Sequence, residues 1–141
     1  MKRIIALRGK GNSGKTTTIR ILHDLLMTNG YTEVQSNFRI NSGDFTTIFK
    51  KKNSLIGITS SGDTYDLVHD QLQGMVDEDC KICVCACRTS DRVPPGTNAA
   101  ILEFHDYVNE FIEKAIVESN RQSTSNSSDA QILLGRIENG L

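Results

Sequence analysis

Eight consecutive residues near the start of the chain have the types and the spacing needed to hold a phosphate group. The segment Gly9-Lys10-Gly11-Asn12-Ser13-Gly14-Lys15-Thr16 fits the pattern G-x-x-x-x-G-K-[ST] without a mismatch. Its glycines let the backbone turn N–H groups inward and approach a ligand closely. We expect Lys15 to reach the β- and γ-phosphates and the Thr16 hydroxyl to coordinate Mg²⁺. The residues expected to contact the nucleotide are Gly9, Lys10, Gly11, Asn12, Ser13, Gly14, Lys15, Thr16 and Thr17.

The segments on either side are those that such a loop requires. Residues 2–8 are predicted as a strand, and residues 14–29 as a helix with apolar side chains spaced along one face. The free N–H groups and the dipole of that helix would point at the same anion. A tight turn that happens to contain glycines explains Gly9 and Gly14, but it does not explain a Lys-Thr pair at this offset.

The loop resembles those of known P-loop NTPases. Residues 9–17 are similar to the deviant loop G-K-G-G-x-G-K-T-T of the partitioning and septum-positioning ATPases, and differ from it at Asn12, where that family has glycine. In that family the early lysine, here Lys10, reaches the nucleotide of a dimer partner, which implies a nucleotide-dependent homodimer. Residues 12–17, followed by a helix that ends at residues 29–31, also resemble the small molybdopterin-guanine-dinucleotide adaptor GTPases.

Length and composition favour a single domain that is not a general nucleic-acid binder. The chain has 141 residues and a net charge of −1, and we expect its only basic run, residues 50–52, to be a solvated turn. No apolar stretch approaches the roughly 18–20 residues that span a membrane, and no signal peptide is visible, which predicts a cytoplasmic protein. The four cysteines fall within residues 80–87, where the pattern is typical of a buried parallel strand. We therefore expect reduced core cysteines rather than a metal site.

Periodicity and turn signals predict the remaining elements. Residues 45–49 and 55–59 flank the lysine run and are expected to form a hairpin, which would give the sheet an antiparallel edge. Residues 33–40 are either a strand or an irregular crossing. The other predicted elements are helices at residues 64–77 and 99–118, a strand at 81–88, a flexible polar linker at 119–128 and a short helix within 129–141.

The acid that usually orients Mg²⁺ in a P-loop enzyme is missing from its expected place. The strand at residues 55–58 is followed by Thr59, where a GTPase would have an aspartate. Asp63 is the nearest acid, and Asp66 is a weaker candidate. We expect Asp63 either to hold Mg²⁺, directly or through water, or to cap the helix that follows.

An arginine follows the most hydrophobic strand. Open α/β sheets bind ligands beyond the carboxyl ends of their strands, so Arg88, with Arg92, is expected to face a phosphate unless it is an ordinary surface arginine. Residues 88–91 stand where a GTPase has N-K-x-D and lack its Asn and Lys, which favours ATP over GTP. The expected catalytic residues are therefore Lys15, Asp63 and Arg88, and the expected metal ligands are Thr16 and Asp63.

Together these features predict an α/β fold: a three-layer sandwich of P-loop NTPase type, whose mainly parallel sheet has four or five strands and a hairpin edge. Residues 1–118 would form the nucleotide-binding domain, followed by the linker at 119–128 and the helix within 129–141. The leading function is a slow Mg²⁺-dependent ATPase. A kinase that moves the γ-phosphoryl group to a small acceptor and a nucleotide-dependent binding switch with little turnover stay open. The sequence does not identify a protein partner.

Overall fold

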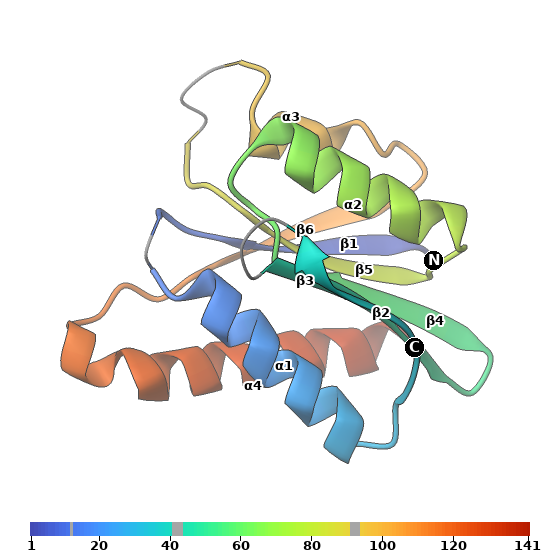
Figure 1. Ribbon diagram of the computed structural model, residues 1–141, viewed down its shortest axis with the longest axis horizontal. Helices are drawn as coiled ribbons and strands as arrows, with labels where there is room; N and C mark the ends of the chain where they lie inside the picture. The colour runs from blue at the N-terminus through green and yellow to red at the C-terminus, as the bar shows by residue number, and fades with distance from the viewer. Residues whose placement is uncertain (12, 41–43, 91–93) are drawn as a thin grey trace.

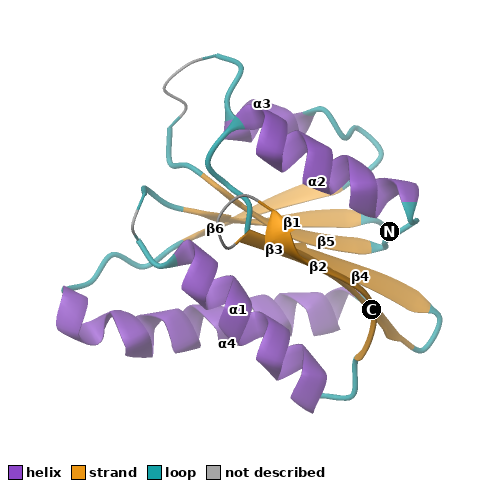
Figure 2. Cartoon of the chain, in the orientation of Figure 1, coloured by secondary structure: helices purple, strands orange, loops and turns teal. Residues whose placement is uncertain are grey.

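Six strands form one mixed sheet with helices on both faces in the computed structural model (Figures 1 and 2). The structure describes residues 1–11, 13–40, 44–90 and 94–141. The elements in chain order are β1 (Arg3–Arg8), α1 (Lys15–Thr28), β2 (Thr32–Ile40), β3 (Asp44–Lys51), β4 (Ser54–Thr59), α2 (Tyr65–Asp77), β5 (Ile82–Cys87), α3 (Thr97–Leu102), β6 (Val108–Glu113), a 3₁₀ turn (Ser119–Arg121) and α4 (Gln122–Gly140).

The strand order is β2-β3-β4-β5-β1-β6. The four strands from β4 to β6 in this order run parallel, whereas β2 and β3 are antiparallel to their neighbours. Parallel strands end at the same edge of a sheet, which is where ligands bind in open α/β folds. Because β3 runs against β4, its first residue, Asp44, lies at that same edge.

Each face of the sheet has its own apolar core. Successive residues of β1 point to opposite faces: Ile5 and Leu7 pack among the side chains of α1 and α4, and Ile4 and Ala6 among those of α2 and α3. Figure 2 shows the resulting layers, with α2 and α3 above the sheet and α1 and α4 below it. The expected α/β architecture with helices on both faces is therefore present.

The cysteines belong to the second of these cores. Cys80 and the three cysteines of β5 are free and fully buried, as the alternation in their sequence predicts. Burial raises the pKa of the Cys85 thiol, so this group stays neutral at ordinary pH.

The predicted hairpin is confirmed. Thr46 pairs with Thr59 and Lys51 with Ser54 across β3 and β4, and the lysine run lies at the turn. Residues 33–40 prove to be a strand, since β2 pairs with β3 along its outer edge. The antiparallel part of the sheet thus has two strands beyond β4, and the described chain has six strands rather than four or five.

The helix predicted at residues 99–118 is wrong. Helix α3 ends at Leu102, and residues 108–113 form the parallel edge strand β6. Both cores bury β1, and without β6 one side of β1 would carry unpaired N–H and C=O groups. Pairing of Val108–Glu113 with β1 satisfies these groups, and this long-range constraint overrides the helical spacing of the apolar residues.

The linker predicted at residues 119–128 is also wrong. A 3₁₀ turn leads directly into α4, which begins at Gln122 instead of near Asp129. Asn126 and Asp129 are only 4% and 5% exposed. Most of the other described side chains at residues 120–128 are exposed, so the polar composition that suggested a flexible segment belongs to the solvent-facing side of a helix. No helix in the described part of the chain is long and apolar enough to cross a membrane.

Candidate functional site

The glycine-rich loop is fixed between three elements. The Gly9 N–H donates to the Cys87 carbonyl at the end of β5 (3.0 Å). A Cβ on Gly9 would lie 2.9 Å from the Lys114 Cβ, just beyond β6. Gly14 has a φ of 93°, and a Cβ there would lie 2.4 Å from the Asn126 Oδ1 of α4. Two of the three expected glycines are therefore required by close packing, and Asn12 lies outside the described residues.

Lys15 is buried and turned back onto the loop. Its ammonium donates to the carbonyls of Gly9 (2.7 Å) and Lys10 (2.8 Å), and the residue is 7% exposed. No carboxylate forms an ion pair with it in the part of the chain that the structure describes. Burial lowers the pKa of Lys15, and the nearby charge of Arg88 lowers it further. An ammonium has three donors, so one remains for an anion.

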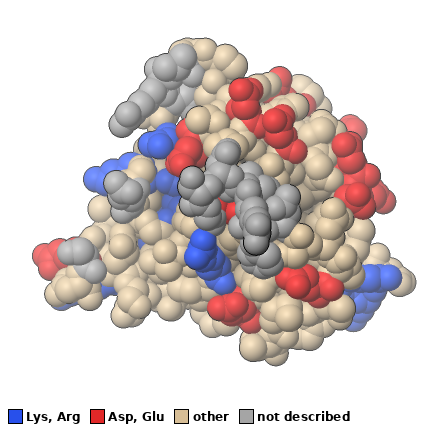
Figure 3. Space-filling model, in the orientation of Figure 1, with Lys and Arg blue, Asp and Glu red and all other residues tan. Residues whose placement is uncertain are grey.

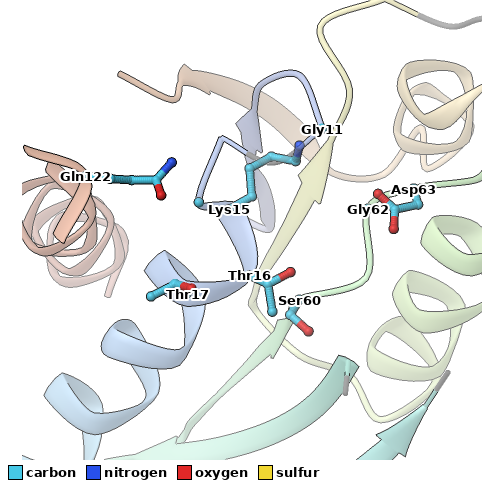
Figure 4. Close-up of a pocket in the computed structure, with 9 residues that line it drawn as sticks. Gly11, Lys15, Thr16, Thr17, Ser60, Gly62, Asp63 and Gln122 are labelled. Atoms are coloured by element: carbon cyan, nitrogen blue, oxygen red, sulfur yellow. The ribbon is translucent and has the colours of Figure 1, made fainter. Parts of the chain in front are cut away.

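A cavity of about 410 Å³ opens beside this lysine at the start of α1. Figure 4 shows the Lys15 side chain reaching toward Gly11 along one wall, with Thr16 next to Ser60 at the bottom and Gln122 on the opposite side. The cavity is lined by Gly11, Gly14, Lys15, Thr16, Thr17, Ser60, Gly62, Asp63 and Gln122. Residues from the loop, the end of β4 and the start of α4 thus surround one volume.

Thr59 occupies the position expected for a metal-binding acid, and its hydroxyl is fully engaged. It donates to the Phe45 carbonyl (3.2 Å) and accepts from the Thr46 hydroxyl (2.9 Å) and the Ser61 N–H (3.3 Å). Thr59 is completely buried. It therefore fixes the end of β4 against β3 and has no capacity left for a metal.

Asp63 and Arg88 meet at the rim of the cavity. The Arg88 Nη2 lies 3.2 Å from the Asp63 Oδ1, and its Nε donates to the Asp63 carbonyl (3.3 Å). Helix α2 is capped by Thr64, which accepts from the Leu67 N–H, so Asp63 is not the cap. Arg88 also covers the loop, since its Nη1 lies 3.2 Å from the place of a Cβ on Gly11. Arg92 lies outside the described residues.

The sequence-predicted residues therefore converge. Lys15, Asp63 and Arg88 are close enough that both of the other charges act on the pKa of Lys15. Lys10 is exposed on the loop and Thr17 on the first turn of α1, whereas the Ser13 hydroxyl is buried and has no hydrogen-bond partner among the described residues. Thr17 lines the cavity, as Thr16 does, whereas Lys10 and Ser13 do not.

The sequence reasoning missed a second acid at the site. Asp44 is half-buried at the start of β3, and its Oδ1 accepts a hydrogen bond from the Ser60 hydroxyl (3.0 Å). Burial raises the pKa of the Asp44 carboxyl, and Asp63 is close enough to raise it further. The predicted hairpin contained the signal, because an antiparallel partner of residues 55–59 must begin where that strand ends.

Polar residues of α4 were missed as well. Gln122 lines the cavity, and the Asn126 Oδ1 is buried over Gly14 with no hydrogen-bond partner in the part of the chain that the structure describes. Lys114 and Asp129 form a buried ion pair (2.9 Å) that ties the segment after β6 to the same helix. These contacts were missed because the sequence pattern of residues 119–128 predicts a flexible linker.

The donor set suits Mg²⁺. Thr16, Ser60, Asp44 and Asp63 offer only hard oxygen ligands, which this ion prefers. Among the described residues no three His, Cys, Asp or Glu side chains converge as a metal site. Mg²⁺ is commonly held by one or two protein oxygens together with substrate phosphates, so a smaller set is sufficient.

Comparisons with known proteins add little. No protein-family model and no curated protein matches the chain. It is similar to a crystal structure of APE1195, with 18% identity and a TM-score of 0.42 over 99% of this chain and 75% of the other.

The contact between Gly14 and α4 predicts opposite effects of two glycine substitutions. Gly14→Ala should destabilise the protein by about 1–3 kcal/mol, because of its positive φ and its contact with Asn126. Gly135→Ala should stabilise it by about 0.5–1 kcal/mol, since a Cβ there meets nothing within 4 Å in a helix interior. Urea denaturation measures both.

Adding Asn126→Ala separates the two causes. If α4 covers the loop as described, the double variant Gly14→Ala/Asn126→Ala should be less destabilised than the sum of the two single variants. Strict additivity would place Asn126 away from the loop.

Proposed function

We propose that the chain binds a nucleoside triphosphate with Mg²⁺ in the cavity beside Lys15 and hydrolyses it slowly, with ATP as the favoured nucleotide. The observation that carries this proposal is the buried Lys15 ammonium. Two backbone carbonyls hold it at the start of a helix, without a carboxylate partner among the described residues. A phosphate oxygen would take its remaining donor and provide the missing negative charge. The glycine-rich pattern of the loop and the α/β arrangement favour the P-loop NTPase class.

The surrounding cations support a polyanionic ligand. Arg88 lies over Gly11 and lowers the pKa of Lys15, so two positive charges are held close together. Arg88 is paired with Asp63, but the Lys15 ammonium has no carboxylate partner among the described residues. An anion in the cavity would contact this lysine close to the arginine, which suits a chain of phosphates better than a single carboxylate. During hydrolysis, water attacks the γ-phosphorus, the bond to the bridging oxygen breaks, and ADP and phosphate are released. Lys15 and Arg88 would stabilise the charge that develops on the leaving oxygens.

A smaller cavity of about 150 Å³ favours a nucleotide over a simple phosphate. It shares Gln122 with the cavity beside Lys15 and also includes Lys10, Ser13 and the segment 115–117. Ile116 is 72% exposed there. An exposed apolar residue beside a phosphate site gives a base ring a surface to pack on.

A binding switch with little turnover is the second candidate. Its support is the end of β4, where the Thr59 hydroxyl is saturated, and the Asp63 carboxylate, which is neutralised by Arg88. Neither group is then ready to orient a metal or a water. Metal orientation would fall to Asp44, together with the Thr16 hydroxyl, and a bound Mg²⁺ would neutralise part of the phosphate charge.

Lys15→Ala tests the central proposal. We expect ATP affinity to fall by about tenfold or more, since hydrogen bonds to charged groups contribute roughly 1.5–3 kcal/mol. Calorimetric titration measures it, with Lys50→Ala as the control, because Lys50 is an exposed lysine of β3 away from the cavity. Unchanged affinity in Lys15→Ala would remove the proposal. Radiolabelled ATP then separates hydrolysis from a switch, which leaves ATP intact.

Substitution of the two acids locates the metal. Asp44→Asn should reduce the Mg²⁺-dependent gain in ATP affinity by about threefold to tenfold, whereas Asp63→Asn should reduce it less because Arg88 already neutralises Asp63. Asp70→Asn, at an exposed position farther along α2, is the matched control. Titrations with Mg²⁺ and with EDTA provide the readout. The reverse order of effects would assign the metal to Asp63.

Ile116→Ser tests the base surface. We expect it to weaken ATP binding by about threefold to tenfold, because it removes apolar contact area, and to leave pyrophosphate binding unchanged. Ile132→Ser is a suitable control, since Ile132 is also exposed but lies on α4 outside this cavity. Equal losses for ATP and pyrophosphate would mean that Ile116 supports the loop and not a base.

A further inference from the structure

A second large cavity lies at the opposite edge of the sheet, away from the glycine-rich loop. It has a volume of about 460 Å³, comparable to that beside Lys15. Lys81 precedes β5 and Ser54 begins β4, so the cavity is at the amino ends of the parallel strands, whereas the loop follows a carboxyl end. The lining residues are Tyr31, Lys51, Lys52, Asn53, Ser54, Lys81, Glu138 and Leu141.

The lining is strongly cationic. Three lysine side chains face one glutamate. Lys51 is committed locally, since its ammonium donates to the Asn29 carbonyl (3.2 Å) and lies 3.9 Å from the Glu138 Oε2. Lys52 and Lys81 are in no ion pair within the described ranges. Figure 3 shows lysine and arginine side chains gathered at the right-hand edge, over the β3–β4 hairpin, in a chain whose net charge is −1.

One wall of this cavity is aromatic. Tyr31 is 3% exposed, and the Lys51 ammonium lies 4.4 Å from the centre of its ring. This contact holds Lys51 in place over the ring, as a cation–π pair does. The cavity therefore combines two uncommitted ammonium groups with a rigid apolar wall. Pockets of this volume that carry a few charged side chains are typical of small-molecule sites.

We propose that this cavity, here named the lysine pocket, binds a small phosphorylated molecule through Lys52 and Lys81. Two lysines that line one cavity and form no ion pair in the described residues match the charge of a phosphate ester or a diphosphate. The limited extent of the cavity and the modest number of cations fit a small molecule better than a nucleic acid, which would need an extended basic surface. This site is separate from the one that we propose for ATP, and neither proposal depends on the other.

Pyrophosphate is the probe, and backbone NMR shows where it binds. In the full chain carrying Lys15→Ala, titration should shift the amide signals of Ser54 and Lys81. The double variant Lys52→Gln/Lys81→Gln should weaken this binding by about tenfold or more, from the loss of two charged hydrogen bonds. Lys50→Gln is the matched control because Lys50 adjoins the same hairpin without lining the pocket. Dispersed spectra of each variant verify that it is folded.

The outcomes separate this proposal from its rivals. Shifts confined to residues 13–16 would reject the lysine pocket and leave the ATP proposal intact. An equal loss in Lys50→Gln would also reject it, since general attraction by the hairpin charges would then be the cause. Ribose 5-phosphate and AMP then show whether the ligand carries a base. Tighter binding of AMP would mean that a base packs against the wall formed by Tyr31, and equal binding would mean that the pocket recognises the phosphate group alone.

Discussion

The parallel pairing of β1 between β5 and β6 is the constraint on which the rest of this structure depends. It places the ends of β1, β5 and β6 at one edge of the sheet, so the loop after β1 lies between Arg88 and Lys114. The same pairing satisfies both sides of a strand that two apolar cores bury completely. The loop has little freedom as a result, because close packing on neighbouring strands fixes its first glycine.

Electrostatics at this edge follow from that convergence. Lys15 begins α1 and Arg88 follows β5, and the two lie close enough that Arg88 lowers the pKa of the lysine. Asp63, which is paired with Arg88, is close enough to raise the pKa of Asp44. Arg88 and Asp63 offset each other at the rim of this cavity, whereas the Lys15 ammonium has no carboxylate partner among the described residues. The fold therefore holds one buried cation whose charge the described side chains do not compensate.

The local part of the site could be predicted from the sequence, and the long-range part could not. The loop from Gly9 to Thr16 and the β3–β4 hairpin have short-range signals, in glycine spacing and in alternation around a turn. The apolar residues of strand β6 have the spacing of a helix. This segment becomes a strand because it pairs with the side of β1 whose backbone N–H and C=O groups would otherwise be unpaired. The first residues of α4 are of types that favour loops. They are nevertheless helical because Asn126 and Asp129 pack against Gly14 and Lys114, which are far away in sequence.

The buried pair of Lys114 and Asp129 limits how this chain can change. The two side chains are 0% and 7% exposed, and Asp129 also accepts from the Ala115 N–H. Loss of either partner would leave an uncompensated charge in the interior, which costs about 3–5 kcal/mol, whereas two apolar residues of matching volume can replace such a pair with little loss. A substitution at position 114 is therefore tolerated only together with a matching substitution at position 129, and the reverse. Any relative that keeps this helix against its loop should carry both charges or neither.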